Sequence, residues 1–148
     1  MLERCNEVFS GMPDHDVGVL RCEGLDQLPV WWRFAEGSRV YLGFGAKPNT
    51  SGIYGTERDE TWPIEWRGVE QRGNFEPFAV IVRMTFPVSG FATDHRSYLF
   101  VYRLRPDGTS CVIGSSLVSN EEARDLADGS REQFECIEEP DRWAFDKD

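Results

Sequence analysis

The sequence predicts an α+β fold in which an antiparallel sheet of about six strands packs against one C-terminal helix. Short runs rich in β-branched and aromatic residues follow one another through most of the chain, separated by turn-forming residues. A helical pattern is clear only near the C-terminal end, in residues 119–134. Because we find no repeat, no low-complexity tract and no break in composition, we expect the 148 residues to form a single domain, with 137–148 as an acidic tail.

The expected strands are joined by recognisable turns. Residues 78–86 are nearly continuous in apolar and β-branched residues, so we expect a central strand with both faces covered. Residues 97–104 are its expected antiparallel partner, and the Arg-Pro-Asp-Gly sequence of 105–108 predicts a turn. The β-rich runs from which the sheet of about six strands is expected to form are 17–22, 29–34, 39–44, 62–67, 78–86, 97–104 and 110–114.

One helix is predicted, from Asn120 to about Phe134. Ser119 precedes it, and Glu122 follows Ser119 at the spacing of a capping box. Apolar residues then recur at helical spacing and form one stripe that faces the sheet. The expected core combines this stripe with the strands and consists of Val40, Leu42, Phe78, Val80, Val82, Leu99, Val101, Val112, Leu126 and Phe134.

The charge balance restricts the class of partner. The chain has 26 acidic and 16 basic residues, which gives a net charge of −10 and argues against a protein that wraps nucleic acid. No window approaches about 18 uninterrupted apolar residues, so no membrane span is expected. Any charged partner, whether a protein or a small ligand, is therefore expected to be cationic. The sequence does not decide whether the chain forms a homodimer through sheet edges.

Cys5, Cys22, Cys111 and Cys136 form an even set, with one close pair toward each end of the chain. The sequence alone allows several connectivities, and four reduced, buried thiols are the alternative. The even number and paired spacing favour two disulfides, Cys5–Cys22 and Cys111–Cys136, each worth roughly 3 kcal/mol in the chain-entropy model. No cysteine pair has the Cys-x-x-Cys spacing of a zinc site, so neither a metal nor a cofactor is expected.

Two disulfides would place the chain in an oxidising compartment, either periplasmic or secreted. The first residues, however, lack the basic region followed by an apolar region that marks a secretory signal. Two interpretations follow: a cytoplasmic protein with reduced cysteines, or a chain that begins after a removed export segment. The cysteines favour the second interpretation.

Catalytic motifs are missing from the sequence, which has no Gly-x-Ser-x-Gly elbow, no Ser-x-x-Lys and no His-Glu-x-x-His. A carboxylate beside a histidine can orient the imidazole or help to bind a metal. The histidines with such neighbours are His15, beside Asp14 and Asp16, and His95, beside Asp94. Incidental neighbours in loops are the simpler interpretation, because adjacent side chains of an extended chain point apart.

The adjacent residues Trp31 and Trp32 suggest a ligand site, because neighbours on a strand face opposite sides of the sheet. One ring would then be exposed, unless both faces are covered and the pair is ordinary core. The long polar loop 47–61 follows, and its acidic side chains are Glu57, Asp59 and Glu60. We expect these groups to bind a ligand with an apolar body and positive charge. The acids could also hold Ca²⁺, although solvated charge is the simpler interpretation.

A series of short segments extends from Cys22 to Cys136. They are Cys22-Glu-Gly24, Pro29-Val-Trp31, Arg39-Val-Tyr-Leu-Gly-Phe-Gly45, Ile64-Glu-Trp-Arg67, Phe75-Glu-Pro-Phe-Ala-Val-Ile-Val-Arg83, Leu99-Phe-Val-Tyr-Arg-Leu104, Gly108-Thr-Ser-Cys111, Glu122-Ala-Arg-Asp-Leu-Ala-Asp128 and Phe134-Glu-Cys136. In this order they resemble a group of uncharacterised exported proteobacterial proteins. The resemblance implies an exported domain with a Cys111–Cys136 bridge, and it brings no activity and no functional residue.

Two functional hypotheses result. The first is a non-catalytic, disulfide-stapled binding module of the bacterial cell envelope. The second is a small hydrolase or metal-dependent enzyme that uses a histidine and carboxylates. They differ in one observable feature: an enzyme should gather these groups in one concave pocket, whereas a binding module should show an exposed aromatic patch.

Overall fold

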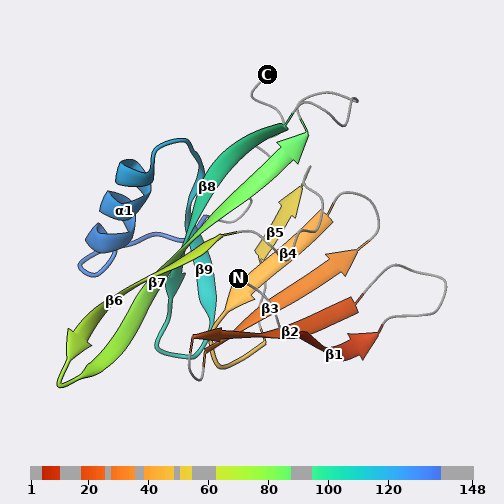
Figure 1. Ribbon diagram of the computed structural model, residues 1–148, viewed down its shortest axis with the longest axis horizontal. Helices are drawn as coiled ribbons and strands as arrows, with labels where there is room; N and C mark the ends of the chain where they lie inside the picture. The colour runs from red at the N-terminus through yellow and green to blue at the C-terminus, as the bar shows by residue number, and fades with distance from the viewer. Residues whose placement is uncertain are drawn as a thin grey trace.

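The computed structural model describes residues 5–10, 18–25, 28–35, 39–48, 51–54, 63–87 and 95–137. In these residues the chain forms two antiparallel sheets and one helix, which confirms the predicted α+β class (Figure 1). The strands divide into two sheets, where the sequence analysis expected one. No helix in these residues is long and apolar enough to cross a membrane.

The elements follow the chain in simple order. The first sheet, sheet A, contains β1 (Cys5–Ser10), β2 (Gly18–Leu25), β3 (Leu28–Ala35), β4 (Arg39–Phe44) and β5 (Ser51–Tyr54). The second, sheet B, contains β6 (Ile64–Gln71), β7 (Asn74–Pro87), β8 (His95–Leu104) and β9 (Ser110–Leu117). The helix α1 (Asn120–Gly129) follows β9. Every strand pairs with its neighbour in sequence within each sheet, so both sheets are meanders.

The three layers are sheet A, sheet B and α1, in that order. One face of sheet B packs against sheet A, and α1 covers the opposite face (Figure 1). The inner strand β7 shows both environments, because Val80 and Val82 face sheet A whereas Ala79 and Ile81 face α1. The prediction of a central strand with both faces covered is therefore confirmed.

Aromatic side chains fill the space between the two sheets. The Phe44 ring lies edge-on to Trp66 at 5.7 Å and to Tyr102 at 4.9 Å, measured between ring centroids. The backbone N–H of Phe44 also donates to Oγ of Ser110, at 2.9 Å. Residues from both sheets thus share one core, in which predicted core residues Leu42, Val80, Val82 and Val112 are fully buried.

The helix begins as predicted and ends earlier. The hydroxyl of Ser119 accepts a hydrogen bond from the Glu122 N–H, as in a capping box. The helix stops at Gly129 instead of continuing to about Phe134, because a turn follows in which the N–H of Ser130 bonds back to Leu126 and Ala127 carbonyls.

Two predicted core residues belong to the surface. Leu126 and Phe134 are 37% and 40% exposed. The helix approaches the sheet through Ala123 and Ala127, which are fully buried, and Leu126 therefore lies at the edge of the contact, above Gly114. Leu99 and Val101 are buried as predicted, Phe78 is partly buried, and the side chain of Val40 lies outside the described residues.

Candidate functional site

Trp31 and Trp32 face opposite sides of sheet A, yet neither ring is exposed. Trp32 is fully buried in the core between the sheets, and Trp31 is only 4% exposed. Nε1 of Trp31 donates to the Gly45 carbonyl at 2.9 Å, and the Arg21 guanidinium lies 5.9 Å from the Trp31 ring centroid. Of the two alternatives for this pair, the observed one is that both faces are covered. The ligand-binding role given to Trp31 and Trp32 stays a prediction.

The other predicted site residues lie outside the part of the chain that the structure describes. These are the acidic loop residues Glu57, Asp59 and Glu60, together with His15 and the aspartates Asp14, Asp16 and Asp94. His95 contributes its backbone to β8, opposite Pro87, while its side chain is not described. Among the described residues, no group of three or more His, Cys, Asp or Glu side chains could hold a metal ion.

The disulfide between Cys111 and Cys136 is confirmed. It joins β9 to the segment that follows α1, and the N–H of Ile137 donates to the Val112 carbonyl at 2.8 Å beside it. Cys22 is also disulfide-bonded, and the backbone of Cys5 lies directly opposite it in the register of β1 and β2. The side chain of Cys5 is outside the described residues, so the Cys5–Cys22 pairing stays a prediction.

An open groove of about 420 Å³ lies where this tethered segment, β9 and the end of α1 meet. Its lining residues are Ile113, Leu126, Ser130, Gln133, Phe134, Glu135, Cys136 and Ile137. We call it the α1–β9 groove. Two partly exposed apolar side chains line it, Leu126 of α1 and Phe134 of the segment that follows. The groove therefore presents apolar surface to solvent next to a covalently fixed wall.

Two irregularities in sheet B help to build this region. Arg67 pairs with Ala79 and Gly68 with Pro77, so Phe78 is an extra residue of β7. A bulge of this kind redirects a side chain, and the Phe78 ring packs with the residues that face α1. In β9, Ile113 is likewise skipped by the register between Val112 and Gly114, and it packs on the same side.

Arg103 of β8 lies beside the groove, between two aromatic rings. Its Cζ is 5.6 Å from the Phe78 centroid and 5.1 Å from the Phe134 centroid. Nε donates to the Ser130 carbonyl at 3.2 Å, and Nη1 donates to the carbonyls of Phe78 and Leu104, at 2.8 and 2.6 Å. Burial lowers the pKa of the Arg103 guanidinium, and repulsion from Arg131 lowers it further.

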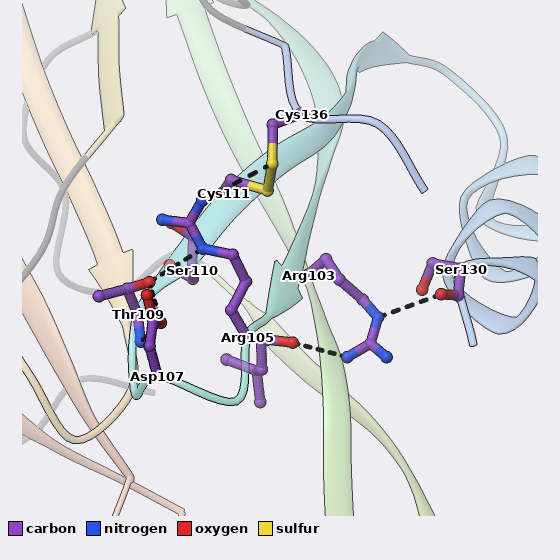
Figure 2. The surroundings of a disulfide bond; sticks show 9 residues. Arg103, Arg105, Asp107, Thr109, Ser110, Cys111, Ser130 and Cys136 are labelled. Atoms are coloured by element: carbon purple, nitrogen blue, oxygen red, sulfur yellow. Dashed lines mark hydrogen bonds between the residues drawn. A yellow bond between two sulfur atoms is a disulfide. The ribbon is translucent and has the colours of Figure 1, made fainter. Parts of the chain in front are cut away.

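Two more arginines border the same region. The Cζ atom of Arg131 lies 5.4 Å from the Phe78 ring centroid. Arg105 lies at the disulfide, with Nη1 3.9 Å from Sγ of Cys136, Nη2 donating to the Ser110 carbonyl and Nε donating to the Thr109 hydroxyl (Figure 2). Chemically, the arrangement combines an open apolar groove, whose lining includes the carboxylate of Glu135, with guanidinium groups of Arg103 and Arg105 that contact its lining residues.

A second groove, of about 340 Å³, lies at the other end of α1. Its two guanidinium groups are already engaged: Arg83 donates to the Asn120 side chain at 2.9 Å, and Arg124 forms two hydrogen bonds with Glu65, at 2.7 and 3.0 Å. This second groove therefore has fewer unoccupied polar groups to offer a ligand.

The α1–β9 groove and the arginines beside it were not predicted from the sequence. A signal for part of it exists in the sequence, because Leu99, Val101, Arg103 and Arg105 alternate along one face of the strand that ends at the predicted turn. The bulges at Phe78 and Ile113 have no such signal, since an extra residue is visible only once the register is known.

Comparisons with known proteins add no relative. No family model, no curated protein and no solved structure matches the chain.

Proposed function

We propose that this chain is a non-catalytic binding module and that its ligand binds in the α1–β9 groove. The observation that carries the proposal is the partial exposure of Leu126 and Phe134 in a groove whose far wall is fixed by the Cys111–Cys136 disulfide. Binding sites combine apolar walls with a few polar groups, and the exposed side chains of Gln133 and Glu135 are such polar groups in the lining of this groove.

The proposed setting is an oxidising compartment, either the bacterial cell envelope or the space outside the cell. The disulfide supports this, because such bonds persist where the cytosolic reducing systems do not act. The resemblance of the segments between Cys22 and Cys136 to exported proteobacterial proteins points the same way. The alternative, a hydrolase or metal-dependent enzyme, depends on His15 and His95 side chains outside the described residues, and it stays a prediction.

The proposal is tested with a neutral apolar probe, 1-octanol, titrated into the full chain while amide NMR resonances are followed. We expect saturable shifts at Ile113, Leu126 and Phe134. Gln133→Trp places a large ring in the groove from an exposed position and should abolish these shifts. The control Val118→Trp adds the same ring at a position that is 71% exposed and outside the groove, and it should bind as the parent does.

The proposal is wrong if octanol produces no saturable shift in the parent. It is equally wrong if the Gln133→Trp variant, with an otherwise unchanged spectrum, binds octanol as tightly as the Val118→Trp variant.

A further inference from the structure

We infer that the α1–β9 groove binds an amphipathic carboxylic acid, with the carboxylate at Arg103 and Arg131 and the apolar body along Leu126 and Phe134. The inference rests on the proposed function, because it assigns a ligand class to the same groove. Three observations carry it: hydrogen-bond donors without acceptors, the absence of a carboxylate partner, and the contacts of Arg103 with Ser130 and Phe134, which line the groove.

Arg103 is held in place with part of its donor set unused. Its Nε and Nη1 donate to three backbone carbonyls, those of Ser130, Phe78 and Leu104, whereas Nη2 has no acceptor among the described residues. The rings of Phe78 and Phe134 fix the guanidinium from the side. A guanidinium that is already oriented loses little freedom on binding, which favours a carboxylate at Nη2.

Arg131 adds a second cation at the same ring. Its guanidinium lies 5.4 Å from the Phe78 centroid and makes no hydrogen bond or ion pair within the described part of the chain. Both guanidiniums therefore lie at the same aromatic ring, and repulsion from Arg131 adds to burial, the larger cause, in lowering the pKa of Arg103. An anion between or beside them would relieve this repulsion.

The absence of a protein carboxylate is unexpected in a chain with 26 acidic residues. Asp128 lies one helical turn from Arg131, but it forms three hydrogen bonds with Arg67 instead. Glu132 and Glu135 are near in sequence, yet within the described ranges neither pairs with Arg103 or Arg131. No carboxylate among the described residues pairs with Arg103 or Arg131, so both guanidiniums are available to an external anion.

The volume and the apolar walls of the groove determine the size and chemistry of the ligand's apolar part. Ser130 and Phe134 belong both to the surroundings of Arg103 and to the groove lining, so the charged rim and the apolar walls are continuous. A volume of about 420 Å³ accommodates an alkyl chain or a single aromatic ring, at the lower end of the roughly 300–1,000 Å³ of ligand pockets. An apolar acid matches both parts, whereas an inorganic anion would leave the walls uncovered.

The test compares three probes that share one tail: octanoate, 1-octanol and octylammonium. Each is titrated into the full chain and observed by amide NMR at low ionic strength. We expect octanoate to bind about tenfold more tightly than octanol, the gain of one charge-assisted hydrogen bond, and octylammonium to bind more weakly than octanol. The octanoate preference should shrink as salt rises, because exposed charges are screened.

Two variants locate the effect. Arg131→Gln removes an exposed guanidinium that stacks on a ring, and it should reduce the octanoate preference to less than about threefold while octanol binds as before. Arg33→Gln is the matched control, because Arg33 is also exposed and stacks on a ring, that of Tyr41 at 5.0 Å, in sheet A. It changes the net charge equally and should leave the preference intact.

The outcomes separate the inference from the proposed function. If octanol binds in the groove and octanoate binds no better, the carboxylate assignment is wrong and the binding module stands. If Arg33→Gln weakens the preference as much as Arg131→Gln does, the effect belongs to the overall charge, and the inference is again wrong. If neither octanol nor octanoate binds, both the inference and the proposed function are overturned.

Discussion

Gly45 lies where the end of β4 meets the turn between β8 and β9. Its φ of 122° belongs to the region that side chains rarely adopt, and the Gly108 carbonyl occupies the space that a Cβ would need. The N–H of Lys47 donates to the same carbonyl at 2.9 Å, and the Gly45 carbonyl accepts from Trp31. This glycine therefore permits the close approach of the two sheets.

Gly45→Ala should be strongly destabilising for two reasons, the positive φ and the clash of a Cβ with the Gly108 carbonyl. Gly73→Ala separates these two effects. Gly73 also has a positive φ, 81°, but nothing lies within 4 Å of a Cβ placed there. We expect Gly73→Ala to lower the free energy of unfolding by about 1–2 kcal/mol through backbone strain alone. Gly45→Ala should cost about 1–3 kcal/mol more because backbone must move. Urea denaturation measures both, and equal losses would show that the approach at Gly108 is not tight.

Trp31 and Trp32 show how far single residues can be interpreted from sequence. Alternation along a strand correctly placed the two rings on opposite faces. It left open whether both faces are covered, because contacts such as the hydrogen bond from Trp31 to Gly45 join residues that are far apart in the sequence, here 14 positions. The same limit applies to Leu126 and Phe134, whose exposure depends on where the helix contacts the sheet.

At the scale of elements, two bidentate ion pairs attach α1 to the edge strand β6. Arg67 donates to both carboxylate oxygens of Asp128, and Arg124 donates to both oxygens of Glu65. The hydrogen bond from Arg124 lowers the pKa of Glu65, and the charges of Arg124 and Arg67 lower it further, against the opposing effect of burial. The ionised carboxylate of Glu65 is thus favoured in the folded state.

This predicts a pH-dependent contribution to stability. Because the pKa of Glu65 is lower in the folded chain than in the unfolded chain, the stabilisation is fully present above the unfolded pKa. It is lost as the pH falls through the folded pKa. We expect Glu65→Gln to lower the free energy of unfolding at neutral pH by less than about 1 kcal/mol, since both partners are substantially exposed.

The measurement is urea denaturation of the parent and the variant from neutral to acidic pH. The difference should shrink as glutamates become protonated. Glu70→Gln, on the same strand and without an ion pair among the described residues, is the control and should show no such change. A Glu65→Gln effect that stays constant into acid would contradict the account.

Element types were more predictable than their arrangement. The apolar run 78–86 identified the inner strand β7, and the Ser119 cap identified the start of α1, because both signals are local. The division of the strands into two sheets has no local signal. A strand has the same pattern of apolar and polar residues whether it joins the sheet of the preceding strand or begins a new sheet. The bulges at Phe78 and Ile113, whose side chains pack on the face of sheet B that α1 covers, could not be predicted for the same reason.

At the scale of the whole molecule, the net charge does not show where individual charges lie, and the expected cationic partner stays a prediction. A net charge of −10 favours a cationic partner on average, and that preference stays a prediction for the loop that carries Glu57, Asp59 and Glu60. Arg103, Arg105 and Arg131 nevertheless gather around the α1–β9 groove. An average over the surface does not locate charges, so composition argues against a nucleic-acid partner without identifying a site.

The Cys111–Cys136 disulfide connects stability with the proposed function. It joins residues 25 positions apart and fixes the segment that walls the groove. In the chain-entropy model a loop of this length contributes roughly 3 kcal/mol. The segment's other described backbone attachment to β9 is the hydrogen bond from Ile137 to Val112. Removing the disulfide should therefore weaken the fold and open the groove together.

The most direct test of a disulfide-stapled binding groove is the affinity of the Cys111→Ala/Cys136→Ala double variant for 1-octanol, compared with the parent by amide NMR. We expect the variant to keep its sheets by circular dichroism, to lose roughly 3 kcal/mol of unfolding free energy, and to bind octanol at least about fivefold more weakly. A folded variant that binds octanol as tightly as the parent would contradict the account, because the groove would then not depend on the tethered segment.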